Sequence, residues 1–223
     1  MDWSLLLVVG LLAAAAVALI FVTRAAERKR LEELRSVAPM LGFSLEVESR
    51  KLAESGLDSA LLAFPLFRHS GSPRVRCLMR ASRIDGEDAV FDFRYTVSTG
   101  KSSHTVEQTV AAFRRRGARL PVFRLHPENL FDKLGQAFGG QDIDFESNEE
   151  FSKRYVLKGD DPDAVRALFE RQAVMHFADR PGWSAEGGGE WLIVFRSSKR
   201  EKPDDLRMWL DEVRQAAQAL GHR

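Results

Sequence analysis

Four arginines form the densest basic segment of the sequence: Arg114, Arg115, Arg116 and Arg119. Basic side chains close to a membrane are attracted to anionic lipid headgroups, by about 1 kcal/mol for each residue near the surface. Nucleic acid is the other anionic candidate, but no nucleic-acid-binding motif accompanies this segment. We therefore predict that these four arginines contact an anionic surface, and we favour lipid over nucleic acid.

The charges around this segment are unevenly spread. The net charge is only +1, yet basic residues predominate between residues 68 and 124 and acidic residues predominate between residues 128 and 163. Such asymmetry is typical of a surface for anionic lipid or for another acidic partner. The alternative interpretation is structural: the two stretches attract each other within one domain, or they are solvated faces.

The five histidines do not have the spacing of a metal site. None forms an H-x-x-x-H pair or a cluster with cysteine, and the sequence contains no nucleophile elbow, phosphate-binding loop or dinucleotide fingerprint. We therefore expect neither a metal nor a cofactor. His104 and His176 are the candidates for acid–base catalysis with nearby acids, in the alternative that the protein is a hydrolase or transferase whose site no motif marks.

Two further features favour structural roles. Asp142, Asp144 and Glu146 alternate along a predicted short strand, but the run lacks the glycine and the terminal glutamate of a calcium loop, so a solvated strand face is favoured. Cys77 alternates with apolar positions, which predicts a buried thiol rather than a nucleophile. A single cysteine cannot form an internal disulfide, which fits a reducing compartment.

The element that positions the rest of the chain is the apolar stretch at residues 3–22, which contains no charged side chain. About twenty residues at about 1.5 Å per residue span roughly 30 Å, the thickness of the hydrocarbon core of a bilayer. We predict a transmembrane helix over residues 3–22. A cleaved signal peptide and a buried core helix are the alternatives, but a signal peptide begins with a positively charged region, and Asp2 is the only charged side chain before this stretch.

Basic residues follow the predicted span: Arg24, Arg28, Lys29, Arg30 and Arg35. Because the cytoplasmic flanks of membrane spans carry the excess of lysine and arginine, we predict that the N-terminus lies outside the inner (plasma) membrane and that the remainder of the chain is cytoplasmic. A juxtamembrane helix is expected over residues 23–38. It should end before Pro39, since the residue before a proline avoids the helical region.

Residues 39–223 are expected to form a cytoplasmic α+β domain, either as one unit or as two packed halves at about 39–125 and 126–223. Alternation of apolar and polar residues on both sides of the Asp85-Gly86 turn predicts an antiparallel hairpin with one buried face. A second hairpin is predicted around residues 187–189. The predicted fold class is therefore a mostly antiparallel sheet with a few helices packed on it.

Other local patterns predict single elements, each from the position of a proline, a capping residue or an apolar stripe. They are a bend or edge strand at residues 63–67, a helix from His126 to Phe138 with Pro127 at its first position, a short strand around Ile143 and Phe145, one helix from Asp161 to about Ala178, and a last helix after Pro203.

Several short motifs resemble those of an uncharacterised family of bacterial single-pass membrane proteins with a soluble domain of unknown function. They are Phe91-Asp92-Phe93-Arg94-Tyr95, Gln108-Thr109-Val110, the run from Leu120 to Glu128, Asp142-Ile143-Asp144-Phe145, and Phe151-Ser152-x-x-Tyr155-x-Leu157-x-Gly159-x-Asp161. The likeness extends over roughly residues 39–200. It implies a bacterial inner-membrane protein with a cytoplasmic body, and it brings no catalytic or binding residues with it.

These observations favour a membrane-anchored cytoplasmic binding or scaffold module over an enzyme. Its expected contacts are a protein partner in the envelope or the anionic inner leaflet. A structural subunit of an envelope complex is a third interpretation, which co-purification in mild detergent would reveal.

Overall fold

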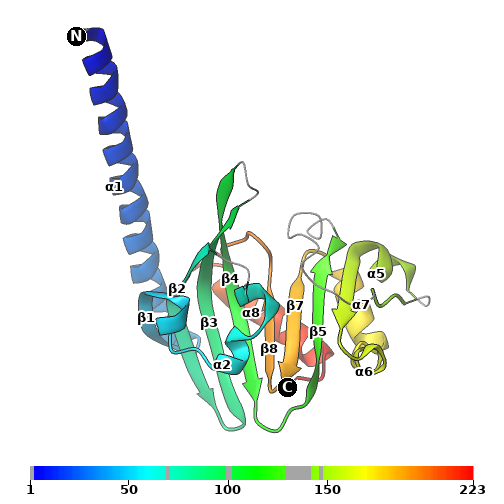
Figure 1. Ribbon diagram of the computed structural model, residues 1–223. Helices are drawn as coiled ribbons and strands as arrows, with labels where there is room; N and C mark the ends of the chain where they lie inside the picture. The colour runs from blue at the N-terminus through cyan, green and yellow to red at the C-terminus, as the bar shows by residue number, and fades with distance from the viewer. Residues whose placement is uncertain (1–2, 69–70, 99–101, 129–141, 146–147, 223) are drawn as a thin grey trace.

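The computed structural model describes residues 3–68, 71–98, 102–128, 142–145 and 148–222. A long N-terminal helix, α1 (Trp3–Met40), leads into a body built on one antiparallel sheet with helices on both of its faces (Figure 1). This arrangement confirms the predicted α+β class.

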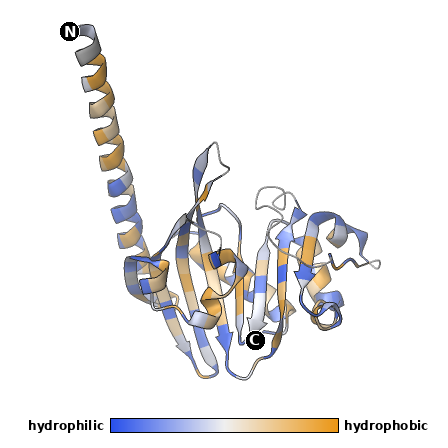
Figure 2. Ribbon diagram, viewed as in Figure 1, coloured by the Kyte–Doolittle hydropathy of each residue, from blue (hydrophilic) through white to orange (hydrophobic). Residues whose placement is uncertain are grey.

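The first half of α1 projects away from the body and is apolar, whereas its second half is polar and packs on the sheet (Figures 1 and 2). An apolar window in this helix has a mean hydropathy of 2.4 and no buried residue, so the helix is long and apolar enough to cross a membrane. The predicted span and the predicted juxtamembrane helix form one continuous element. It ends one residue after Pro39, and Gly42 follows with a φ of 78° in the left-handed region that favours glycine.

The sheet has eight strands in the order β1-β2-β3-β4-β8-β7-β5-β6. Its strands are β1 (Ser44–Lys51), β2 (Gly71–Arg83), β3 (Gly86–Ser98), β4 (Ser103–Arg115), β5 (Leu120–Pro127), β6 (Tyr155–Gly159), β7 (Ser184–Gly189) and β8 (Trp191–Phe195). One sheet thus contains strands from both of the halves considered above, and a boundary near residue 125 would fall inside β5.

Both predicted hairpins are present. β2 turns into β3 at the Asp85-Gly86 turn, where Arg83 pairs with Gly86. β3 and β4 pair along their whole length, from Gly86 opposite Arg115 to Ser98 opposite Ser103. β7 and β8 form the second hairpin. The alternation in the sequence identified these strands, but the prediction of one buried face was wrong: β3 is buried continuously from Asp88 to Phe93, because helices cover both faces of the sheet.

The sheet separates two hydrophobic cores. One face is covered by the end of α1 and by α5 (Glu149–Arg154), α6 (Pro162–Leu168), α7 (Arg171–Asp179) and α8 (Leu206–Ala219). The other face is covered by the short helices η1 (Leu52–Glu54), α2 (Ser59–Leu62) and α3 (Pro65–Arg68). Cys77 is buried in the first core, at an irregularity of β2 where its φ is 50°.

Some single-element predictions were wrong. Pro65 begins helix α3 instead of a strand or bend, because proline is tolerated in the first turn of a helix. The helix predicted from His126 begins later: His126 and Pro127 end strand β5, paired with Val156 and Tyr155 of β6, and Glu128 is the first helical residue. The remainder of that predicted helix, residues 129–138, lies outside the described residues.

Two predictions in the second half also need correction. Residues 142–145 are not a strand, and Glu146 lies outside the described residues. The single helix expected after Asp161 is two helices, α6 and α7, which are separated at Phe169 and Glu170. Glu170 has an extended backbone, and Phe169 is buried in the core, so packing of this aromatic ring divides the apolar stripe into two helices. Asp161 does cap α6, as predicted.

Candidate functional site

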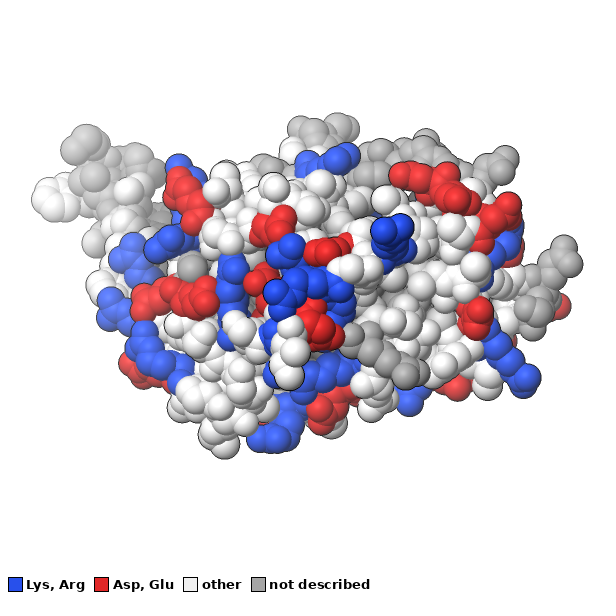
Figure 3. All heavy atoms as spheres, turned by 90° about the horizontal axis from the view of Figure 1, so that it is seen from below, with Lys and Arg blue, Asp and Glu red and all other residues white. Residues whose placement is uncertain are grey.

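The four arginines of the basic segment lie at the end of the sheet opposite the N-terminal half of α1 (Figure 1). Arg114 and Arg115 end strand β4, and Arg116 and Arg119 belong to the connection to β5. Viewed from this end, lysine and arginine side chains gather near the centre of the molecule with acidic side chains among them (Figure 3). Arg114 and Arg115 point to opposite faces of the sheet, because successive side chains of a strand alternate between its two faces.

Arg114 is on the face of the sheet covered by α2, where acids neutralise it. Its Nε donates to Glu190 at 2.9 Å, and its Nη1 is 3.7 Å from Asp58. The hydrogen bond to Glu190 raises the pKa of Arg114, and the same carboxylate accepts a bond from the backbone N–H of Gly117. Arg114 is therefore a structural residue that fastens the turn after β4.

Arg115 is on the other face, where it pairs with the buried carboxylate of Asp88. Arg116 is exposed and donates to the carbonyl of Ile84 at 2.5 Å in the β2–β3 turn. Arg119 is exposed and has no hydrogen-bond or ion-pair partner among the described residues. Of the four predicted residues, Arg115 lines a pocket at this end of the sheet.

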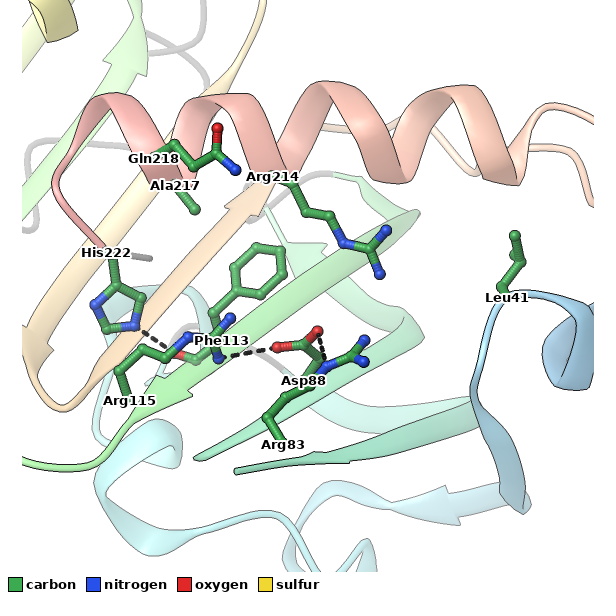
Figure 4. A pocket seen from close by; sticks show the side chains of 9 residues that line it. All are labelled: Leu41, Arg83, Asp88, Phe113, Arg115, Arg214, Ala217, Gln218 and His222. Carbon is green, nitrogen blue, oxygen red and sulfur yellow. Dashed lines mark hydrogen bonds and ion pairs between the residues drawn. The ribbon is translucent and has the colours of Figure 1, made fainter. Parts of the chain in front are cut away.

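This pocket has a volume of about 420 Å³ and lies between the ends of β2, β3 and β4 and the C-terminal part of α8 (Figure 4). Its lining residues come from five elements or their ends: Leu41, Arg83, Asp88, Phe113, Arg115, Arg214, Ala217, Gln218 and His222. We call it the distal pocket.

A buried carboxylate between two guanidinium groups dominates the distal pocket. Asp88 is 2% exposed, and its two oxygens accept from Arg83 Nε at 2.8 Å and from Arg115 Nη1 at 2.9 Å. Arg214 extends from α8 toward the strands, and its ion-pair partner, Asp211, is exposed and 3.8 Å away. Three arginines and one aspartate in the lining leave a surplus of positive charge, which suits a carboxylate or phosphate.

His222 adds a polar wall but not a charge. It is 3% exposed, and its Nε2 lies 3.1 Å from the carbonyl oxygen of Phe113, so Nε2 carries the proton that it donates. Burial lowers the pKa of His222, with only partial compensation from this hydrogen bond. The neutral ring packs beside Arg115 in Figure 4, and the positive charge of the pocket comes from arginine alone.

The chemistry that the distal pocket supports is binding. Among the described residues that line it there is no serine, threonine or cysteine that could act as a nucleophile. Its one carboxylate, Asp88, is occupied by two arginines, and its histidine is held as a hydrogen-bond donor to the backbone. These groups offer guanidinium N–H donors at the pocket wall, and they do not form an acid–base pair with each other.

The two histidines considered for catalysis are not brought to an acid. His104 is exposed on β4, opposite Val97 of β3. His176 of α7 contacts Arg180, with its Nδ1 3.5 Å from the guanidinium, and burial lowers the pKa of His176. Neither ring forms a hydrogen bond with a carboxylate among the described residues.

A different histidine lies between a serine and a carboxylate, and no sequence pattern marked it. His126 Nδ1 is 3.1 Å from Ser184 Oγ, and its Nε2 is 3.4 Å from Glu186 Oε1. Arg124 Nε donates to the same Nε2, which requires the proton to be on Nδ1 and directed at the serine. A histidine in this tautomer cannot accept the serine proton, and all three side chains are buried, so this cluster supports the β5–β7 pairing.

Other candidate groups are also placed by the structure. The thiol of Cys77 is buried, as predicted, and burial raises its pKa to about 11. Asp142 pairs with Lys158 at 3.2 Å. In the described part of the chain, no three His, Cys, Asp or Glu side chains are grouped as metal ligands would be.

Comparisons with known proteins add information about the fold alone. No family model and no curated protein sequence matches the chain. The fold is similar to that in the crystal structure of the mycobacterial trehalose monomycolate transport factor A, TtfA, with a TM-score of 0.60 and 15% sequence identity. The match covers 86% of this chain and 95% of that one. At this identity the likeness shows a shared fold and transfers no residue roles.

Proposed function

We propose that this chain is a membrane-anchored binding module whose cytoplasmic body binds an acidic segment of a protein partner in the distal pocket. The observation that carries the proposal is the surplus of arginine around Asp88, at the end of the body remote from the apolar half of α1. A carboxylate of a partner would be held by Arg214 and by the exposed edges of Arg83 and Arg115.

The location of the pocket favours a protein over the bilayer. The apolar half of α1 leaves the body at the opposite end, so the leaflet that receives α1 is remote from the basic segment (Figure 1). Ile84, at the tip of the β2–β3 turn beside Arg116, is 100% exposed and offers an apolar contact next to the positive charge. Aliphatic and arginine side chains side by side are suited to a protein surface. Contact of Arg114, Arg115, Arg116 and Arg119 with the inner leaflet stays a prediction.

The proposed orientation depends on the basic residues that follow the span. We expect a fluorescent protein fused after Arg223 to be bright and an alkaline phosphatase fused there to be inactive, as for a cytoplasmic C-terminus. The opposite pair of results would place the body outside the cytoplasm and would remove a cytoplasmic partner.

The pocket itself is tested by photo-crosslinking in cells. A photoreactive amino acid at Ile84 of the full-length chain is expected to capture a partner, and the same amino acid at Met208, which is also exposed but lies on α8, is not. Arg214→Gln should reduce the yield at Ile84 several-fold.

Arg207→Gln is the matched control for this experiment, since Arg207 is an exposed arginine of the same helix outside the pocket. Equal yields in the two variants would show that the pocket does not hold the partner. Capture of lipid instead of protein would support the leaflet-contact prediction.

A further inference from the structure

A second basic pocket lies at the other end of the body, where α1 meets the sheet. Its volume is about 660 Å³, and we call it the juxtamembrane pocket. Residues of α1, β2, β3 and β4 line it: Thr23, Arg24, Glu27, Arg28, Arg76, Arg94 and Glu107. Four arginines and two glutamates leave a surplus of positive charge in the lining.

This pocket lies at the depth of a bilayer surface. Thr23 and Arg24 directly follow Val22, the last residue of the apolar stretch. The β3–β4 hairpin extends along the same side of the body as the apolar half of α1 (Figure 1). The pocket is therefore open where the headgroups of the adjacent leaflet would be, on the side of the membrane where the body lies.

An ion-pair network fixes one wall of the juxtamembrane pocket. Arg200 binds Glu27 through two hydrogen bonds, at 2.5 and 2.7 Å. Arg76 lies 3.3 Å from Glu27 and 3.4 Å from Glu107. These contacts pair the charges of Glu27, Glu107 and Arg76 within the protein and hold α1 against the sheet. The three side chains therefore do not need a ligand to balance their charges.

The remaining arginines are available. Arg24 and Arg28 are exposed on α1 and have no acidic partner among the described residues. Arg94 is 44% exposed and has one ion-pair contact, to Glu107 at 3.4 Å. Three guanidinium groups from two elements thus line the pocket, and within the described part of the chain its lining contains no carboxylate other than those of Glu27 and Glu107. Guanidinium groups bind phosphate through paired N–H donors.

We propose that the juxtamembrane pocket binds the headgroup phosphate of an anionic phospholipid in the adjacent leaflet, through Arg24, Arg28 and Arg94. A lipid fits better than free phosphate because the apolar surface of α1 begins at the pocket: Phe21 and Val22 are exposed and can contact the acyl chains. Beside the distal pocket the exposed apolar contact named above is the single side chain of Ile84, which is not part of a helix of membrane-spanning length, so the two pockets would bind different ligands.

The test uses the full-length chain, delipidated in mild detergent and titrated with phosphatidylglycerol or phosphatidylcholine, with bound lipid measured by native mass spectrometry. We expect selective binding of phosphatidylglycerol and a roughly tenfold weaker affinity in R28Q/R94Q, since each basic contact contributes about a few-fold. K29Q/R50Q is the matched control. Lys29 is next to Arg28 on α1. Arg50 is an exposed residue of β1 that lies in the same row of the sheet as Phe93, which precedes Arg94 in β3.

Retention of normal affinity in K29Q/R50Q together with the loss in R28Q/R94Q would support the pocket. Equal losses in both variants would overturn it, because they would indicate general attraction between a basic surface and an anionic headgroup. Equal binding of both lipids would also overturn it. A last arm adds inorganic phosphate: displacement of phosphatidylglycerol at millimolar phosphate would assign the site to a soluble anion and would overturn the lipid assignment.

Discussion

Strand β3 carries two buried aspartates on one face, and the structure uses them differently. Asp88 is bound by arginines of the neighbouring strands, Arg83 and Arg115. Asp92 is 3% exposed and is bound by Arg30 of α1, through contacts of 2.8 and 2.9 Å, and by Arg200 after β8 at 2.8 Å. The first aspartate locks adjacent strands beside an open pocket.

The second aspartate connects parts of the chain that are distant in sequence. Thr109 of β4 also donates to Asp92, at 2.8 Å, and Arg30 donates to the carbonyl of Glu201 at 2.6 Å. Asp92 therefore joins helix α1, the middle of the sheet and the segment before α8. The comparison teaches that the same pairing of aspartate with two arginines can serve as a local brace or as the attachment of a whole element.

The largest expected effect is that of Asp92→Asn. Removing one partner of a buried ion cluster leaves Arg30 and Arg200 without their shared carboxylate, which costs about 3–5 kcal/mol of unfolding free energy. Chemical denaturation in detergent micelles measures this loss. Because α1 would loosen, trypsin should cleave sooner between residues 28 and 35, and the buried thiol of Cys77 should be alkylated faster at pH 8.

Asp85→Asn is the control for that variant, since Asp85 is an exposed acid of the β2–β3 turn whose carboxylate is 3.7 Å from Arg115. We expect it to match the wild type in all three measurements. A stable Asp92→Asn protein with unchanged cleavage of α1 would refute the role of Asp92 as the attachment point.

Asp88→Asn should have a smaller effect, about 1.5–3 kcal/mol, the usual range for hydrogen bonds to charged groups. Arg83 and Arg115 are partly solvated at the pocket, so water can replace part of what the carboxylate provides. Trypsin cleavage of α1 should stay at the wild-type rate. Early cleavage in this variant would mean that Asp88 also helps to attach α1, so the two aspartates would not have different roles.

A pH dependence is expected from His222, with an effect smaller than that of either aspartate. The pKa of His222 is lowered in the folded state by burial, so the unfolded chain takes up this proton at higher pH than the folded chain does. Stability is therefore lost as the pH falls below about 6.5, the ordinary pKa of histidine. Denaturation midpoints between pH 7.5 and 5.5 should fall less in His222→Gln than in the wild type; parallel curves would contradict this.

The smallest effect is expected for Arg119→Gln, within about 0.5 kcal/mol of the wild type, as is usual for an exposed side chain without partners. Arg114→Gln provides the contrast, because it removes a hydrogen bond to Glu190. If Arg119→Gln were the more destabilising of the two, the division of the basic segment by strand geometry would be wrong.

Local patterns were sufficient for much of the fold. The apolar stretch predicted the first half of α1, alternation around Asp85-Gly86 predicted β2 and β3, and the apolar stripe after Pro203 predicted α8. Each signal lies within a few turns or one strand, so it does not depend on the rest of the chain. The helix start predicted at His126 was too early, because His126 and Pro127 pair with β6 and the first helical residue is Glu128. The helix predicted after Asp161 was wrong in its length, because core packing of Phe169 divides it.

The sites depended on contacts that no local pattern contains. The four arginines between residues 114 and 119 suggested one anionic surface, but β4 directs Arg114 and Arg115 to opposite faces of the sheet. His222 and Arg214 reach the distal pocket only because α8 packs beside β4.

By itself, the sequence determined that the chain has an apolar helix of membrane-spanning length and an antiparallel α+β body with a buried cysteine. Only the tertiary structure decided that Asp92 meets Arg30 and Arg200, and that two separate basic pockets lie at opposite ends of the body. The physical reason is that periodicity and hydrophobicity act over neighbouring residues, whereas an ion pair between distant residues exists only after strand order and register have been established.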